Sequence, residues 1–126
     1  MFVTARILLD SNILIEVFNG TVAPAQLFRG GSLLSISAVT VMEMYALSGM
    51  SVDEQERIDQ AMMLLDIIPV TAAIAKRAGM IARTRGRGKP DLLIAATALE
   101  LGLPLFTHNA RDFKGITGLK VISTLS

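Results

Sequence analysis

The fold is decided by one stretch near the start of the chain, Arg6-Ile7-Leu8-Leu9-Asp10-Ser11-Asn12. Its apolar residues 7–9 are consecutive, which predicts a strand covered on both faces, as in a parallel sheet packed between helices. The run stops at Asp10, and residues 13–18 followed by Asn19-Gly20 predict a short helix with a glycine stop. Strand, acidic turn and helix are typical of the first unit of an α/β domain.

Two interpretations of Asp10 are possible from the sequence. Ligands of parallel α/β sheets bind outside the carboxyl ends of the strands, and Asp10 stands at such an end. Alternatively, Asp10, Ser11 or Asn12 simply caps the helix that follows. This stretch alone does not decide between the two roles.

Length and composition bound the remaining possibilities. A chain of 126 residues is long enough for one core and too short for two, so residues 1–126 are expected to form one domain. With Cys 0 and His 1, disulfides and cysteine-bound metals are excluded. The apolar run at 92–99 is far shorter than the roughly 18 residues of a membrane span, and no secretion signal is recognisable, so we expect a cytoplasmic protein with no membrane contact.

The rest of the chain alternates between helical and extended patterns. Two spacings, Thr40 with Glu43 and Ser51 with Glu54, match a capping box at a helix start. For Glu43 this structural role competes with a catalytic one. The predicted helices cover residues 21–28, about 40–48, 51–65, 71–84 and 91–99, the last closed by Gly102, and the predicted strands cover 32–37, 67–70, 105–107 and 121–122.

Carboxylates share one type of position in this pattern. Asp10, Glu43, Asp91 and Asp112 each follow a predicted strand or lie in the first turn of a helix, and in a parallel sheet these positions meet at one edge. Clustered carboxylates repel one another unless a cation lies between them, and oxygen ligands of this kind suit Mg²⁺ or Mn²⁺. Such a centre generates hydroxide and stabilises the charge on a phosphodiester during displacement.

A basic segment suggests the substrate. Residues 67–90 contain six Lys or Arg and no acid, and Arg83, Arg85, Arg87 and Lys89 run from a helix end into a glycine-rich loop. Contacts with the phosphates of RNA would explain this charge. The alternative is a solvated helix end with ordinary C-terminal cations.

With these residues in place, the chain resembles a known family, the PIN-domain ribonucleases, and among them the VapC-type toxins of toxin–antitoxin pairs. The resemblance is carried by four blocks that occur in the family's order: residues 9–15, LDSNILI; residues 37–43, SAVTVME; residues 91–98, DLLIAATA; and residues 107–113, THNARDF. It implies a single-domain α/β fold with three α/β/α layers and a mostly parallel central sheet.

The resemblance also implies a function. It predicts an Mg²⁺- or Mn²⁺-dependent endoribonuclease, frequently a homodimer, that is inhibited by a small antitoxin. The four acids match the family's catalytic and metal-binding quartet, and Asn12, Thr107 and Asn109 match polar positions near the metal. His108 stands where an Arg is common, so one phosphate contact is missing or replaced, and a role as general base competes with an incidental one.

Competing functions remain at this stage. A phosphatase of the haloacid-dehalogenase kind also begins with an acid after its first strand, but it needs a second Asp where this chain has Asn12. A PIN-like domain that binds RNA or protein without cutting has little use for an intact acidic quartet. Finally, the helix at 13–18 is apolar on more than one face, which either a partner or the segment at 25–28 could cover.

Overall fold

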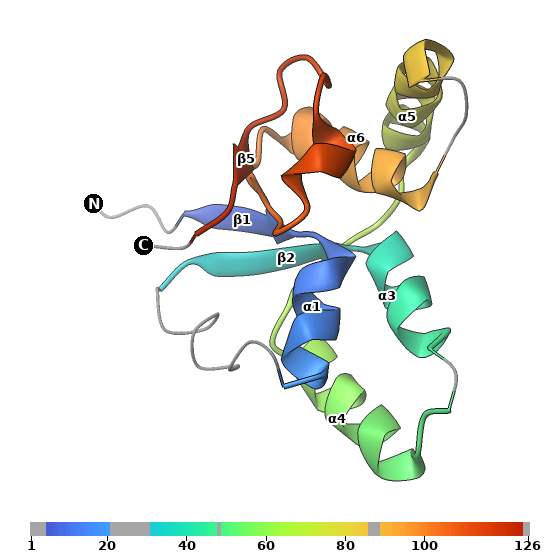
Figure 1. The fold of residues 1–126 in the computed structure, drawn as a ribbon, viewed down its shortest axis with the longest axis vertical. Coiled ribbons are helices and arrows are strands. Elements are labelled where there is room, and N and C mark those ends of the chain that lie inside the picture. The colour runs from blue at the N-terminus through green and yellow to red at the C-terminus, as the bar shows by residue number, and fades with distance from the viewer. Residues whose placement is uncertain (1–4, 21–30, 48, 86–88, 125–126) are drawn as a thin grey trace.

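A five-stranded parallel sheet forms the centre of the protein, seen here in a computed structural model that describes residues 5–20, 31–47, 49–85 and 89–124 (Figure 1). The spatial order is β3-β2-β1-β4-β5, and each neighbouring pair runs parallel. The strands are β1 (Arg6–Leu9), β2 (Leu33–Ser37), β3 (Asp66–Ile68), β4 (Leu105–Phe106) and β5 (Val121–Ile122). The apolar stretch at Arg6–Leu9 therefore forms the middle strand.

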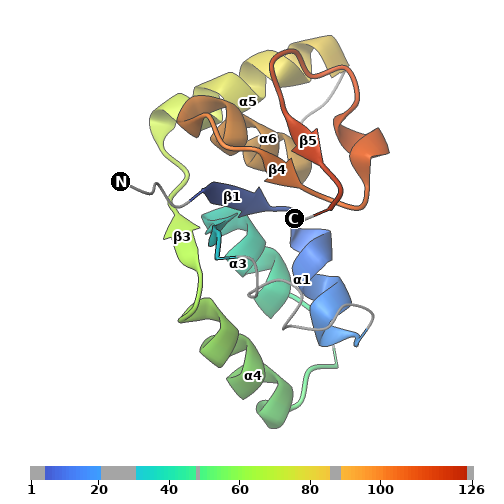
Figure 2. The ribbon, with the colours of Figure 1, turned by 90° about the vertical axis from the view of Figure 1, so that its left-hand side faces the viewer.

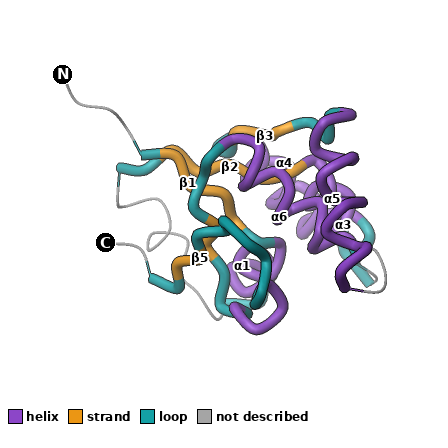
Figure 3. Tube along the Cα trace, turned by 90° about the horizontal axis from the view of Figure 1, so that it is seen from above, coloured by secondary structure: helices purple, strands orange, loops and turns teal. Residues whose placement is uncertain are grey.

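Helices cover both faces of this sheet, which gives the three layers of the predicted α/β fold. In Figure 2, α5 and α6 lie on one side of the strands and α1, α3 and α4 on the other, and Figure 3 shows the strand-to-helix connections from above. No helix among the described residues is long and apolar enough to cross a membrane. The helices are α1 (Ser11–Phe18), α3 (Ala38–Tyr45), α4 (Val52–Met62), α5 (Ala72–Arg85), α6 (Pro90–Leu101) and the short 3₁₀ helix η1 (Ala110–Phe113).

Two hydrophobic cores result from the alternation of side chains along β1. Leu8 is fully buried among residues of α5 and α6, whereas Ile7 and Leu9 belong to the core beneath α1, α3 and α4. Consecutive apolar residues are thus required because each face of the strand has its own core. Helix α6 is apolar nearly all round because it is buried on most sides, with Ile94 fully inaccessible to solvent.

Local signals place most of the helix ends. The capping box of Ser51 and Glu54 begins α4, and the Thr71 hydroxyl accepts a hydrogen bond from the Ile74 amide at the start of α5. Helix α6 ends at Gly102, whose φ of 65° lies in the left-handed region that glycine adopts without strain. These predicted boundaries agree with the structure to within a few residues.

Some boundaries differ from the prediction. Helix α1 begins at Ser11 and not at residue 13, and the third strand covers 66–68 and not 67–70, since Pro69 cannot donate to the sheet. Helix α4 stops at Met62, short of the predicted residue 65. The predicted helix at 21–28 lies outside the described residues.

We expect Leu8→Ala to destabilise the protein by about 2–5 kcal/mol, because it leaves a cavity in the middle of the sheet. The matched control is Leu64→Ala, whose side chain is 67% exposed and should change the free energy of unfolding by less than about 0.5 kcal/mol. Denaturant unfolding of both variants measures the difference. Equal effects would contradict the assignment of β1 to the centre of the core.

Candidate active site

Asp10 is a buried carboxyl group at the carboxyl end of the central strand. Its side chain is 2% exposed, and its Oδ2 accepts a hydrogen bond of 2.8 Å from the Thr107 hydroxyl at the end of β4. Asp10 occupies the N-cap position of α1, yet its side chain makes no capping hydrogen bond to the described residues of that helix. The side chain therefore points to the neighbouring strand end, and capping does not explain it.

The electrostatics of Asp10 identify its neighbours. Burial raises the pKa of Asp10, the hydrogen bond from Thr107 lowers it, and the negative charges of Asp91 and Glu43 raise it again. The Ser11 amide also lowers this pKa. Asp91 and Glu43 are thus close enough to Asp10 to raise its pKa, although 81 positions separate Asp10 from Asp91 (91 − 10).

Glu43 takes part in a different contact from the predicted one. Helix α3 begins at Ala38 with Ser37 as its cap, so the capping box predicted from Thr40 and Glu43 is wrong. Instead, the Ser11 hydroxyl donates to Glu43 Oε1 at 2.7 Å and lies 2.8 Å from the Thr40 hydroxyl. Because Ser11 has a single proton to donate, Thr40 must be the donor to Ser11. This chain of hydrogen bonds fixes Glu43 beside the end of β1.

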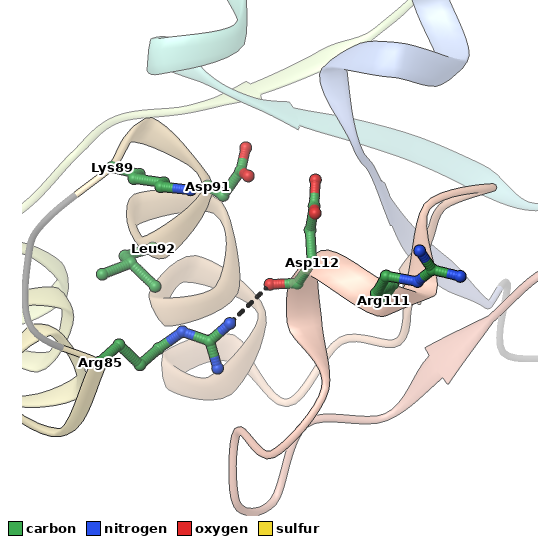
Figure 4. A pocket seen from close by; sticks show the side chains of 6 residues that line it. All are labelled: Arg85, Lys89, Asp91, Leu92, Arg111 and Asp112. Atoms are coloured by element: carbon green, nitrogen blue, oxygen red, sulfur yellow. Dashed lines mark hydrogen bonds between the residues drawn. The ribbon is translucent and has the colours of Figure 1, made fainter.

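Asp91 and Asp112 line a pocket of about 390 Å³ between the start of α6 and η1. Figure 4 shows their carboxylates pointing the same way. Burial raises the pKa of Asp91, the charge of Asp112 raises it further, and Lys89 and Arg85 lower it. The remaining lining residues are Arg85, Lys89, Leu92 and Arg111.

Polar residues predicted to lie near the metal form a second network. The Thr107 hydroxyl, which donates to Asp10, accepts a hydrogen bond of 2.9 Å from the backbone N–H of Asn109. The Asn109 side chain in turn donates to Asp112 Oδ2 at 2.5 Å, so Thr107 and Asn109 link two of the acids. Asn12 is exposed on the first turn of α1. Its proximity to a metal stays a prediction.

The predicted basic residues do not all behave alike. Lys89 borders the acidic pocket and is exposed, as RNA contact requires, and Arg83 is exposed on α5. Arg85 instead donates to backbone carbonyl oxygens of the η1 region. Arg87 lies outside the described residues. Arg111 also lines the pocket and is not among the residues predicted from the sequence. Its place directly before Asp112 was the available signal.

His108 lies at the edge of this region. Its Nδ1 is 2.6 Å from Glu16 Oε2 on α1, and its ring lies 5.3 Å from the Phe106 ring, centroid to centroid. A carboxylate can only accept, so Nδ1 carries the proton in this contact. The imidazole is therefore held by α1. Its role as general base stays a prediction.

The chemistry of the donor set fits Mg²⁺ or Mn²⁺. Asp10, Glu43, Asp91 and Asp112 offer carboxylate oxygens. Burial, and after it the charges of neighbouring acids, raise the pKa of Asp10 and of Asp91, and a divalent cation would offset both effects. In the part of the chain that is described, no three such side chains are drawn together tightly enough to hold a metal ion. Ligation by these four residues stays a prediction.

The chain is similar to known proteins in sequence and in fold. The PIN domain family matches residues 7–119. Ribonuclease VapC10 of Mycobacterium tuberculosis is 34% identical over 122 residues, which cover 90% of each chain. A toxin-antitoxin complex from Klebsiella pneumoniae is similar with a TM-score of 0.77 and 31% identity, covering 93% of this chain and 96% of that one. VapBC2 from Rickettsia felis, bound to a DNA fragment from its promoter, is similar with a TM-score of 0.77 and 25% identity, covering 93% and 97%.

The chain belongs to the PIN domain family. Within that family its resemblance to the VapC-type ribonucleases, which the four sequence blocks indicate, is confirmed.

We expect Asp10→Asn to raise the free energy of unfolding in EDTA at neutral pH. A carboxyl group whose pKa is raised on folding stabilises the folded state while protonated, and this contribution disappears as pH rises through its folded pKa. Asn removes the charge and keeps an oxygen that can accept from Thr107. The advantage of the variant should therefore shrink as pH falls through the raised folded pKa of Asp10 and be smallest near about pH 4, where carboxyl groups approach protonation in both states.

Denaturant unfolding between about pH 4 and about pH 7 measures this difference. The control is Glu56→Gln on α4, an exposed position whose stability difference from wild type should stay flat. An Asp10→Asn variant less stable than wild type at neutral pH would show that the site stabilises this charge.

Proposed function

We propose that this chain is an Mg²⁺- or Mn²⁺-dependent endoribonuclease and the toxin of a type II toxin–antitoxin pair. The observation that carries the proposal is the buried Asp10, whose pKa is raised by its burial and by the charges of Asp91 and Glu43. Burying a carboxylate beside other acids costs stability. A protein that only binds RNA has no use for such a group, whereas a hydrolytic metal centre needs it. The identity with a ribonuclease over nearly the whole chain supports the same activity.

The residues divide into separate roles in this proposal. Asp10, Glu43, Asp91 and Asp112 would hold the metal, which would supply hydroxide at neutral pH and stabilise the charge that develops on the phosphodiester. Thr107 holds Asp10 in place and Asn109 holds Asp112. Ser11 orients Glu43 with the hydroxyl proton that it donates. Lys89 and Arg111 border the same pocket and are suited to hold the phosphates on either side of the scissile bond.

The partners follow from the same comparisons. Solved relatives that cover nearly the whole chain are complexes of a toxin with its antitoxin, which supports a cognate antitoxin for this chain. A homodimer is part of the proposal as well. Among the described residues, Ile15 and Phe18 of α1 border a groove of about 220 Å³ with residues of α4, which offers apolar surface for such a contact. The alternative cover at 25–28 lies outside the described residues.

We expect RNA cleavage to require Mg²⁺ or Mn²⁺ and to stop in excess EDTA. Asp91→Asn should lower kcat by at least about two orders of magnitude, the scale on which one charge-stabilising group contributes. It should also reduce the stabilisation by Mg²⁺, which reaches about 2.7 kcal/mol for wild type at a hundredfold excess over Kd. Cleavage assays and thermal melts with and without Mg²⁺ measure both effects.

Glu56→Gln, which removes an exposed charge from α4, is the matched control for both measurements and should behave as wild type. Full cleavage by the purified wild type in EDTA, with contaminating nucleases excluded, would remove the metal from the mechanism. An unchanged Mg²⁺ response in Asp91→Asn would remove Asp91 from the site.

We expect the double variant Lys89→Gln, Arg111→Gln to weaken RNA binding and flatten its salt dependence. If each side chain contacts one phosphate, the log–log salt slope on single-stranded RNA should fall by roughly 0.7 per residue. Lys120→Gln is the matched control, since it removes an exposed cation just before β5. Lys120 therefore lies at the amino end of its strand, whereas the acids lie at the carboxyl ends. Binding titrations in EDTA over a range of salt concentrations measure the slopes. Equal slopes for all three proteins would assign the two cations to the solvated surface.

A further inference from the structure

Arg85 is the last residue of α5, and its guanidinium spans two backbone carbonyl groups of another segment. Nη1 donates to the Lys114 carbonyl oxygen at 2.8 Å, and Nη2 donates to the Asp112 carbonyl oxygen at 3.0 Å. Figure 4 shows the second of these bonds, which reaches from α5 past the start of α6 to η1. The basic sequence pattern favours a contact of Arg85 with RNA, but these two bonds give Arg85 a partner inside the protein.

From this geometry we propose that Arg85 is a positioning residue that holds the η1 turn, and with it the Asp112 carboxylate, in place beside Asp91. The inference rests on the proposed function, because it concerns the site in which Asp112 acts. It assigns to Arg85 an effect on the reaction that does not require contact with RNA.

The η1 turn depends on such a support. It is a 3₁₀ helix of four residues, a class with poor hydrogen-bond geometry, and Lys114 leaves it with an extended backbone. Carbonyl groups at the end of a helix lack partners within that helix, and a charged donor satisfies them more strongly than a neutral one. Phe113, 3% exposed, fixes the other side of the turn in the core. The buried ring and the guanidinium together determine where Asp112 lies.

The position of Asp112 matters for its neighbour as well. The charge of Asp112 raises the pKa of Asp91, after the larger effect of burial, and Arg85 lies close enough to lower it. The same side chain thus brings the two acids together and offsets part of their repulsion. Asn109 holds the Asp112 carboxylate directly, so Arg85 fixes the backbone while Asn109 fixes the side chain.

The shape of the guanidinium separates this role from that of a simple cation. A planar fork with donors at fixed angles can span two carbonyl groups, whereas a lysine ammonium offers the same charge from a single point. Arg85→Lys therefore keeps the charge and removes the two-point attachment. Arg85→Gln removes both. If Arg85 contacted a phosphate, lysine would largely replace it. The two-point attachment of Arg85 to the Asp112 and Lys114 carbonyl groups would be lost with lysine.

The experiment compares wild type, Arg85→Lys, Arg85→Gln and Arg77→Gln. Arg77 is the matched control, because it is also an α5 arginine with a partner inside the protein, Glu100 on α6 at 2.5 Å. Steady-state cleavage of one RNA substrate with Mg²⁺ gives kcat and KM. Hydrogen exchange in EDTA follows the amides of Asp112 and Lys114, which are bonded within the turn to Asn109 and Arg111.

We expect both Arg85 variants to lower kcat by roughly 10- to 100-fold, since a misplacement on the order of 1 Å costs up to about 100-fold. KM and the salt slope of RNA binding should stay within about twofold of wild type, as expected when ground-state binding is unchanged. The two turn amides should exchange at least about tenfold faster in both variants. Arg77→Gln should match wild type in every measurement.

Three results would overturn the inference. Wild-type kcat in Arg85→Lys would show that charge alone suffices. A raised KM with unchanged kcat and a flatter salt slope would show that Arg85 contacts phosphate. Unchanged exchange at Asp112 and Lys114 would show that Arg85 does not hold the turn. A wild type that never cleaves RNA would instead overturn the proposed function. The exchange data in EDTA would then show by themselves whether Arg85 holds the η1 turn.

Discussion

The rest of the site depends on one buried charge at the end of the central strand. Asp10 is 2% exposed, and its carboxylate has one hydroxyl donor, Thr107, against the repulsion of Asp91 and Glu43. A folded chain keeps such an arrangement only if the surrounding packing outweighs it. Two hydrophobic cores, one on each face of β1, supply that packing. The packing of both cores therefore offsets the cost of burying Asp10.

The two sides of the sheet contribute different halves of the site. The layer of α1 and α3 brings Ser11 and Glu43 to the end of β1 through a chain of hydroxyl groups. The layer of α5 and α6, together with η1, brings Asp91 and Asp112. The link between the halves is Thr107, which follows β4 and joins Asp10 to the Asn109 backbone. The parallel order of β1 and β4 makes this link possible, because both strands end at the same edge.

Charge is arranged around this edge in a consistent way. Asp10 is buried and Asp91 is half-buried, whereas the exposed cations Lys89 and Arg111 border the pocket that Asp91 and Asp112 line. A polyanion would be attracted by the border, while the acidic interior repels it unless a cation is present. Arg85 and His108 are turned to internal partners, the η1 carbonyl groups and Glu16.

The sequence by itself determined the parallel sheet, the helix ends at Ser51, Thr71 and Gly102, and the placement of the four acids after strands or at helix starts, because these depend on hydrophobic periodicity, local capping and position after strands. The tertiary structure alone decided the partners of those acids. The Thr40–Glu43 spacing matched a capping box, but Ser37 caps the helix and Glu43 turns to Ser11, 32 positions away in the chain. Arg85 likewise matched a solvated or RNA-binding cation until η1 came beside it. Local spacing describes interactions within one or two helical turns, whereas contacts between layers arise only when the sheet brings distant segments together.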